Sequence, residues 1–157
     1  MMNRFKRFFL RFIKLPPQLV YALGLGPIYG RLVLLLTTIG RKSGLPRVTP
    51  LQYEEVDGIY YVAAARGQKA DWFRNIVADP KVTVQLQDRS FQALAEPVTD
   101  PARIADFFEL RLERRPRMMG RMMRLEGLPP NHTRADLEAF AADKAMVVIR
   151  PAPDAIK

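Results

Sequence analysis

The sequence of 157 residues contains no cysteine and a single histidine, His132. The absence of cysteine excludes disulfide frameworks, thiolate metal sites and a cysteine nucleophile. One imidazole cannot form a metal site built from several histidines, and we expect no metal site. His132 follows two prolines in a predicted loop, where we expect a surface or capping role.

Long uninterrupted apolar runs are also lacking. A membrane-spanning helix needs about twenty consecutive apolar residues, whereas the apolar stretch 19–39 is interrupted by Gly24, Gly26, Pro27, Gly30 and Arg31. We therefore expect a short apolar segment, a turn and then a buried strand. Residues 1–14 interleave basic and apolar side chains, which is not the pattern of a secretory signal peptide.

Acidic residues are scarce relative to basic ones: 16 Asp and Glu stand against 25 Lys and Arg, for a net charge of +9. This surplus predicts an anionic partner, for which nucleic acid, an anionic membrane and a phosphorylated cofactor are the candidates. No recognition-helix or base-stacking motif accompanies the charge, so we expect no nucleic-acid partner.

Part of the surplus lies in residues 4–14, where large apolar residues recur at helical spacing among cations: Phe5, Phe8, Phe9, Phe12 and Ile13. The pattern predicts a basic amphipathic helix. Such a helix lies either in a membrane interface or on the core of its own domain, and the sequence leaves both open.

Alternating or continuous apolar segments predict strands over 31–38, 47–56, 59–66, 81–87, 90–98 and 145–150. Asp57-Gly58 predicts a tight hairpin, and Asp88-Arg89 a second turn. Helices are expected after the candidate N-caps Asp71, Asp100 and Thr133.

This order predicts a mainly β, α+β fold: a small barrel of about six mostly antiparallel strands, with helices at the N-terminus, between strands and near the C-terminus. We expect the barrel domain over 31–151, a basic helix with an apolar turn segment over 1–30, and a tail over 152–157.

Two of these strands are joined by Gly40-Arg41-Lys42-Ser43-Gly44-Leu45-Pro46-Arg47. Arginine and lysine make charge-assisted hydrogen bonds to phosphate, and glycine admits the backbone conformations that expose N–H groups. The spacing is not that of a Walker loop. The segment is therefore either an anion-binding loop or a hairpin loop with solvated charges.

Three segments resemble the deazaflavin-dependent nitroreductase family of split β-barrel oxidoreductases: residues 36–51 (LTTIGRKSGLPRVTPL), 62–67 (VAAARG) and 72–84 (WFRNIVADPKVTV). The likeness covers roughly residues 30–100. It implies a split β-barrel and the deazaflavin coenzyme F420, which carries a phosphodiester and a polyglutamate tail. FMN is the alternative cofactor, and other split barrels bind haem.

The resemblance also implies the cofactor-binding residues. The cationic loop would hold the phosphate and tail, the alanine-rich strand end would lie along the deazaflavin ring, and the segment after it would border the cofactor. The residues are Arg41, Lys42, Ser43, Gly44, Arg47, Thr49, Pro50, Ala63, Ala64, Ala65, Arg66, Gly67, Asp71, Trp72, Phe73 and Asn75.

On the substrate side the sequence departs from the family. Ala65 stands where relatives carry serine, and Gln52 and Tyr53 occupy the place of a tyrosine after the Pro-Leu pair. Residues 101–144 contain no tyrosine but several methionines. We expect a changed, apolar substrate, with a pocket formed by Gln52, Tyr53, Met118 and Met122. No catalytic residue is assigned.

The hypothesis is an F420-dependent oxidoreductase that transfers a hydride to a quinone-like, unsaturated or nitro compound. Hydride transfer of this kind needs neither a nucleophile nor a metal, because the cofactor supplies the chemistry. The alternatives are a split barrel that binds FMN or haem, and a non-catalytic protein that binds lipid. We expect a cytoplasmic monomer or homodimer, with residues 4–14 either on the inner face of the cell membrane or packed on the barrel.

Overall fold

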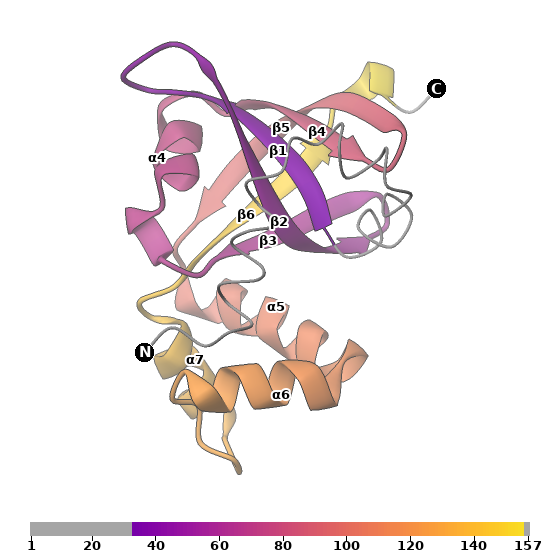
Figure 1. Ribbon diagram of the computed structural model, residues 1–157. Coiled ribbons are helices and arrows are strands. Elements are labelled where there is room, and N and C mark those ends of the chain that lie inside the picture. The colour runs from indigo at the N-terminus through magenta and orange to yellow at the C-terminus, as the bar shows by residue number, and fades with distance from the viewer. Residues whose placement is uncertain (1–32, 156–157) are drawn as a thin grey trace, which may run out of the picture.

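The computed structural model describes residues 33–155. The helix expected over 4–14 and the apolar turn segment up to residue 30 lie outside the described residues. Six strands close into a barrel in the order β1-β2-β3-β6-β5-β4, and every neighbouring pair is antiparallel (Figure 1). The strands are β1 (Val33–Ile39), β2 (Pro46–Val56), β3 (Ile59–Ala64), β4 (Lys81–Leu86), β5 (Arg89–Val98) and β6 (Ala145–Pro151). The predicted mainly β barrel is confirmed.

The helices form two groups around the barrel. α4 (Asp71–Ala78), preceded by the 3-10 turn η1 (Gly67–Lys69), lies beside the barrel, whereas α5, α6 and α7 lie together at one end of the molecule (Figure 1). Their bounds are Pro101–Arg114, Pro116–Leu125 and Arg134–Ala141, and a short 3-10 turn, η2, covers Pro153–Ala155. Pro116 separates α5 from α6 because proline has no backbone N–H to continue a helix.

Local signals predicted several of these boundaries. Asp57 and Gly58 both have positive φ, at 51° and 79°, as a two-residue type I′ hairpin requires. Asp100 caps α5 through Ala102, and Thr133 forms a capping box with Asp136 at the start of α7.

Several expected boundaries were wrong by one or two residues. β3 ends at Ala64 instead of continuing to residue 66. Ala70 is the N-cap of α4, and Asp71 is its first residue, because the Asp71 carboxylate accepts a hydrogen bond from Arg41 instead of capping the helix. The turn between β4 and β5 falls at residues 87–88, since Arg89 already pairs with Leu86 in the sheet.

Two apolar cores share the wall formed by β3 and β6. One core fills the barrel, and the other lies between the outer face of these strands and the helices α5, α6 and α7. Side chains alternate across a strand, so Val147 and Ile149 of β6 enter the barrel core while Met146 and Val148 enter the helical core.

Within residues 33–155, no helix is both long enough and apolar enough to cross a membrane.

Candidate functional site

The loop between β1 and β2 has a defined backbone. The Gly40 N–H donates to the Leu45 carbonyl at 2.8 Å, and the Gly44 N–H donates to the Gly40 carbonyl at 2.8 Å. Gly44 has φ of 69°, a conformation that glycine adopts without a steric cost. The N–H groups of Lys42 and Ser43 bond to no described residue. The loop therefore presents backbone donors between cationic side chains.

Asn75 of α4 holds this loop in place. Its Oδ1 accepts hydrogen bonds from the Arg41 backbone N–H at 3.1 Å and from Arg41 Nη1 at 3.0 Å. Its Nδ2 donates to Thr38 Oγ1 of β1 at 3.2 Å, and both Asn75 and Thr38 are buried. Arg41 Nη2 also pairs with Asp71 at 3.1 Å. The loop, β1 and α4 thus form one hydrogen-bonded unit.

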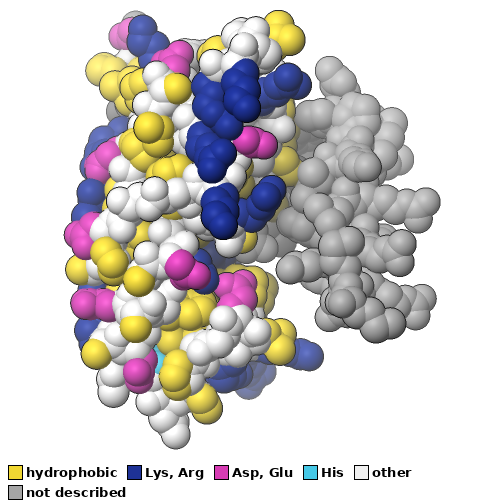
Figure 2. All heavy atoms as spheres, turned by 90° about the vertical axis from the view of Figure 1, so that its left-hand side faces the viewer, with side chains coloured by type: hydrophobic (Ala, Val, Ile, Leu, Met, Phe, Trp, Pro, Cys, Tyr) yellow, Lys and Arg dark blue, Asp and Glu magenta, His cyan; other side chains and the backbone are white. Residues whose placement is uncertain are grey.

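Basic side chains gather beside this unit. Figure 2 shows a row of Lys and Arg side chains on the face of the molecule that carries α4. The exposed cations of the loop, the start of β2 and the segment 66–74 are Lys42, Arg47, Arg66, Lys69 and Arg74, and we call them the cationic face. Asp71, the acid in segment 66–74, is paired with Arg41. The cationic face suits an anionic ligand.

The remaining predicted cofactor residues do not all expose their side chains. Ala64 and Phe73 are buried in the barrel core, whereas Ala63 is half-buried on the outer face against the helical core. Trp72 packs against the barrel core and stays half-buried. A Cβ at Gly67 would lie 2.5 Å from the Asp143 carbonyl oxygen, so this position has no room for a side chain.

Other predicted residues lie on β2, in the loop that precedes it and directly after β3. Thr49 and Pro50 are half-buried on β2, Ser43 is exposed and accepts a hydrogen bond from the Leu45 N–H, and Ala65 is exposed after β3. The structure thus brings Arg41, Asp71 and Asn75 into direct contact.

The predicted substrate residues point in different directions. Gln52 is exposed and its Oε1 accepts a hydrogen bond from Arg111 Nη2 at 2.9 Å. Tyr53, the next residue on β2, packs against the barrel core at 5.8 Å between its ring and that of Tyr60, and burial raises its pKa. Met118 and Met122 lie exposed on α6.

A charged cluster that the sequence did not predict joins β2 to the helices. The carboxylate of Glu54, 2% exposed, accepts hydrogen bonds from Arg114 at 3.0 Å and from Arg115, and Arg111 Nε lies 3.7 Å away. Burial lowers the pKa of Arg111, and the Glu54 carboxylate opposes that shift. The two adjacent arginines, Arg114 and Arg115, are visible in the sequence. No sequence pattern near them indicates that they pair with an acid 60 residues earlier.

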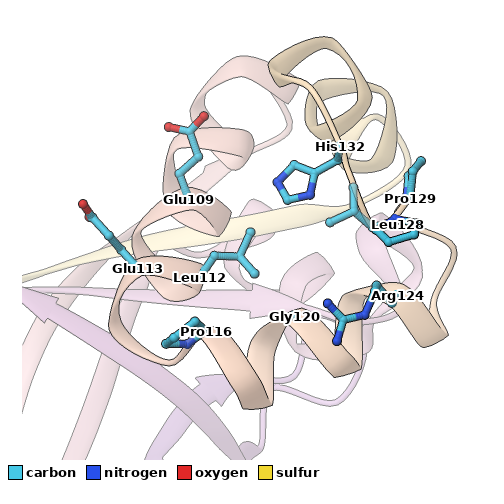
Figure 3. A pocket seen from close by; sticks show the side chains of 10 residues that line it. Glu109, Leu112, Glu113, Pro116, Gly120, Arg124, Leu128, Pro129 and His132 are labelled. Atoms are coloured by element: carbon cyan, nitrogen blue, oxygen red, sulfur yellow. The ribbon is translucent and has the colours of Figure 1, made fainter.

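A cavity of about 450 Å³ lies between α5, α6 and the loop that leads to α7. Figure 3 shows Glu109 and Glu113 on α5, Arg124 on α6 and His132 in the loop. His132 is half-buried at the rim of this cavity. No group of three or more His, Asp or Glu side chains suited to a metal occurs among the described residues.

A closed antiparallel barrel with a cationic loop held against a short helix places this chain in the split β-barrel class. The family model described as F420H(2)-dependent quinone reductase matches residues 23–129, and the chain belongs to this family. The resemblance to F420-dependent split barrels that the motifs indicated is confirmed, with quinone reductase as the family description.

An F420H(2)-dependent quinone reductase of Mycobacterium tuberculosis is 34% identical over 68 residues, which are 41% of this chain and 46% of the relative. The chain therefore spans about half the length of the curated relatives that it matches.

Among solved structures, an F420-H2 dependent reductase (FDR-A) is 25% identical with a TM-score of 0.50, over 75% of this chain and 94% of that one. HutZ, the heme storage protein from Vibrio cholerae, has a TM-score of 0.54 at 14% identity, over 80% and 87% of the two chains. This second likeness shows the fold alone.

Proposed function

We propose that this protein is an oxidoreductase of the cytoplasm that binds coenzyme F420 and reduces an apolar, quinone-like compound. The observation that carries the proposal is the cationic loop, which Asn75 holds in place. This loop offers positive charge and backbone hydrogen-bond donors to the same ligand. Membership in the F420H(2)-dependent quinone reductase family supports the choice of cofactor and substrate class.

The residues present fit F420. Arg41, Lys42 and Arg47 would bind its phosphodiester and the first carboxylates of its tail, together with the Lys42 and Ser43 N–H groups. The methyl side chains of Ala63 and Ala65 let a flat ring approach the strand end, and Trp72 would border it. When bound, reduced F420 supplies a hydride; the protein supplies position and a dry surface.

Gln52 is our candidate for orienting the substrate. A guanidinium only donates hydrogen bonds, so the amide oxygen of Gln52 must face Arg111, and the amide N–H2 points the other way. By the register of β2 and β3, Gln52 comes directly before the pair Tyr53–Val62, which places it beside Ala63. A fixed amide there would donate to a substrate carbonyl at the edge of the ring site.

Titration of F420 into the full-length protein, followed by cofactor fluorescence, tests the binding. We expect Arg41→Ala with Lys42→Ala to weaken binding at least tenfold, since each charge-assisted bond contributes about 1.5–3 kcal/mol. Lys81→Ala removes an exposed cation of β4 and serves as the control. Failure of the wild type to bind F420 at tens of micromolar, or tighter binding of FMN in the same assay, would contradict the proposal.

The same titration separates binding from substrate orientation. Gln52→Ala should leave F420 affinity within about twofold and raise the KM for a quinone, because the N–H2 group of this amide would contact the substrate and not the cofactor. Gln92→Ala is the matched control on β5.

We further propose that residues 4–14 bring the protein to the membrane that dissolves its substrate. Deleting residues 1–14 should then reduce co-sedimentation with anionic vesicles without changing F420 affinity. Equal sedimentation of both proteins would contradict this part of the proposal.

A further inference from the structure

The helix α6 (Pro116–Leu125) presents an apolar stripe to solvent. Met118, Met122 and Leu125 are 47%, 37% and 80% exposed, and their spacing of four and three residues places them on one side of the helix. Met119 and Met123, which lie about 100° further round the helix, are buried in the helical core. Neighbouring exposed apolar side chains mark an interaction surface more often than apolar residues scattered singly do.

Two arginines form a second, shorter stripe beside the first. Arg117 and Arg121 are exposed, and each comes one position ahead of an exposed methionine. Arg124 lines the cavity between α5 and α6 instead. Within the described chain, neither Arg117 nor Arg121 forms an ion pair with a carboxylate, and α6 itself contains no acid. Arg134 of α7, by contrast, is paired with three carboxylates.

The position of α6 leaves these stripes accessible. α6 lies on the side of α5 that faces away from the barrel, at the edge of the molecule (Figure 1). The surface is one side of a single helix, so a partner must accept protruding side chains. A bilayer interface does so: apolar side chains enter the acyl boundary while arginines extend to the level of the phosphates.

We propose that α6 is a docking surface for an anionic lipid bilayer, with Met118, Met122 and Leu125 inserted and with Arg117 and Arg121 at the lipid phosphates. Methionine suits this position because its flexible, polarisable side chain adapts to a disordered environment. The idea that the bilayer supplies an apolar substrate rests on the proposed function. The lipid contact of α6 does not.

Co-sedimentation of the full chain with vesicles tests the surface. The vesicles are equal parts phosphatidylglycerol and phosphatidylcholine, compared with phosphatidylcholine alone. Arg117→Gln with Arg121→Gln should weaken binding to the anionic vesicles about 25-fold, since each cation near such a surface contributes about fivefold. Leu125→Ser should weaken it about tenfold through lost apolar burial.

Matched controls separate this surface from net charge and general hydrophobicity. Lys81→Gln with Arg89→Gln removes two exposed cations from β4 and β5, and Leu94→Ser removes an apolar side chain, 56% exposed, on β5. Both control proteins should bind anionic vesicles within about twofold of wild type.

Several outcomes would overturn the proposal. One is that the wild-type protein does not bind anionic vesicles. Another is that the α6 variants bind anionic vesicles as well as the control variants do. Vesicle binding that is lost on deletion of residues 1–14 and unchanged in the α6 variants would assign the lipid contact to residues 1–14. Conversion of a wild-type dimer to a monomer by Leu125→Ser, with vesicle binding unchanged, would make α6 a contact between copies. None of these measurements uses F420, so their failure is distinct from failure of the proposed function.

Discussion

At the residue scale, the carboxylate of Glu54 binds arginines at the end of α5 and at the N-cap of α6. Arg111 lies close by, 7% exposed, with its guanidinium 5.6 Å from the Phe107 ring and its Nε without a hydrogen-bond partner among the described residues. A buried ion pair adds little net stability when intact, but removing one partner leaves the other charge uncompensated.

Glu54→Gln should therefore destabilise the protein by about 3 kcal/mol, because the guanidinium groups lose their buried counter-charge. Glu55→Gln is the matched control, since the Glu55 side chain is exposed and Arg114 bonds only its backbone carbonyl. The control should stay within about 0.5 kcal/mol of wild type. Urea unfolding measures both, and equal stability of the two variants would refute a structural role for the Glu54 cluster.

Glu96 makes stability depend on pH in the acid range. Hydrogen bonds from Arg103, with a second arginine at Arg150, hold the pKa of Glu96 below its ordinary 4.5. A folded-state pKa below the unfolded one gives stability that is present above the unfolded value and lost as pH falls through the folded value.

Glu96→Gln should lower stability at neutral pH by less than about 1 kcal/mol, because the pair is partly exposed. The variant should also lose less stability than wild type between about pH 5 and pH 3. Urea midpoints across that range measure the difference. If the urea midpoints of the two proteins change in parallel with pH, the pKa of Glu96 is the same in the folded and the unfolded state.

At the element scale, Asn75 joins its own helix α4 to β1 and to the loop after β1. Its partners Thr38 and Arg41 lie 37 and 34 residues earlier in the sequence. Asn75→Ala should weaken F420 binding about tenfold, since the loop loses the acceptor that positions Arg41. It should also cost about 2 kcal/mol, because the Arg41 N–H and the buried Thr38 hydroxyl lose their partner.

Asn131→Ala changes an exposed asparagine in the loop before α7 and is the control for Asn75→Ala. Fluorescence titration and urea unfolding measure the two effects separately. Unchanged F420 affinity in Asn75→Ala would mean that the loop keeps its shape without α4.

The elements that the sequence predicted are those with local causes. The Asp57-Gly58 hairpin, the Asp100 cap and the alternation of β4 each depend on residues a few positions apart, and all three were correct. The Glu54 cluster was missed because its partners lie 57 to 61 positions away, and a charged residue in a strand does not reveal which helix will cover it.

The candidate site follows the same division. The motif identified Arg41 and Asn75, but not that Asn75 would accept hydrogen bonds from Arg41, which depends on how α4 packs on β1. Asp71 was expected to cap its helix, and the nearby guanidinium changed that outcome. The substrate pocket expected at Met118 and Met122 stays a prediction: both lie exposed on α6, and the methionine content of the segment does not show which face of a helix each will occupy.

At the scale of the whole molecule, β6 belongs to both cores. Val147 faces the barrel core and Val148 the helical core, and neither side chain is more than 1% exposed. Loss of either core removes packing from the same strand. We therefore expect one cooperative unfolding transition.

Fluorescence of Trp72, the single tryptophan, reports on the barrel side, and far-UV circular dichroism reports mainly on the helices. The two denaturation curves should coincide in wild type and in Val148→Ala, which should be destabilised by about 2 kcal/mol. Val147→Ala provides the comparison from the barrel side. A circular dichroism transition that precedes the Trp72 transition would show that the helices melt independently.

The barrel closes between β1 and β4 over three residue pairs, Leu35–Gln85, Leu36–Val84 and Thr37–Thr83, which is its shortest ladder. The strand that forms this ladder leads directly into the cationic loop, and Asn75 ties the two together through Thr38. Opening of the barrel at this ladder would displace the loop. By linkage, a ligand that holds the loop raises the free energy of that opening. Deuterium exchange at the backbone amides of residues 35–37 should therefore slow as ligand binds to the cationic loop, so that exchange at these amides measures the fraction of protein with ligand bound.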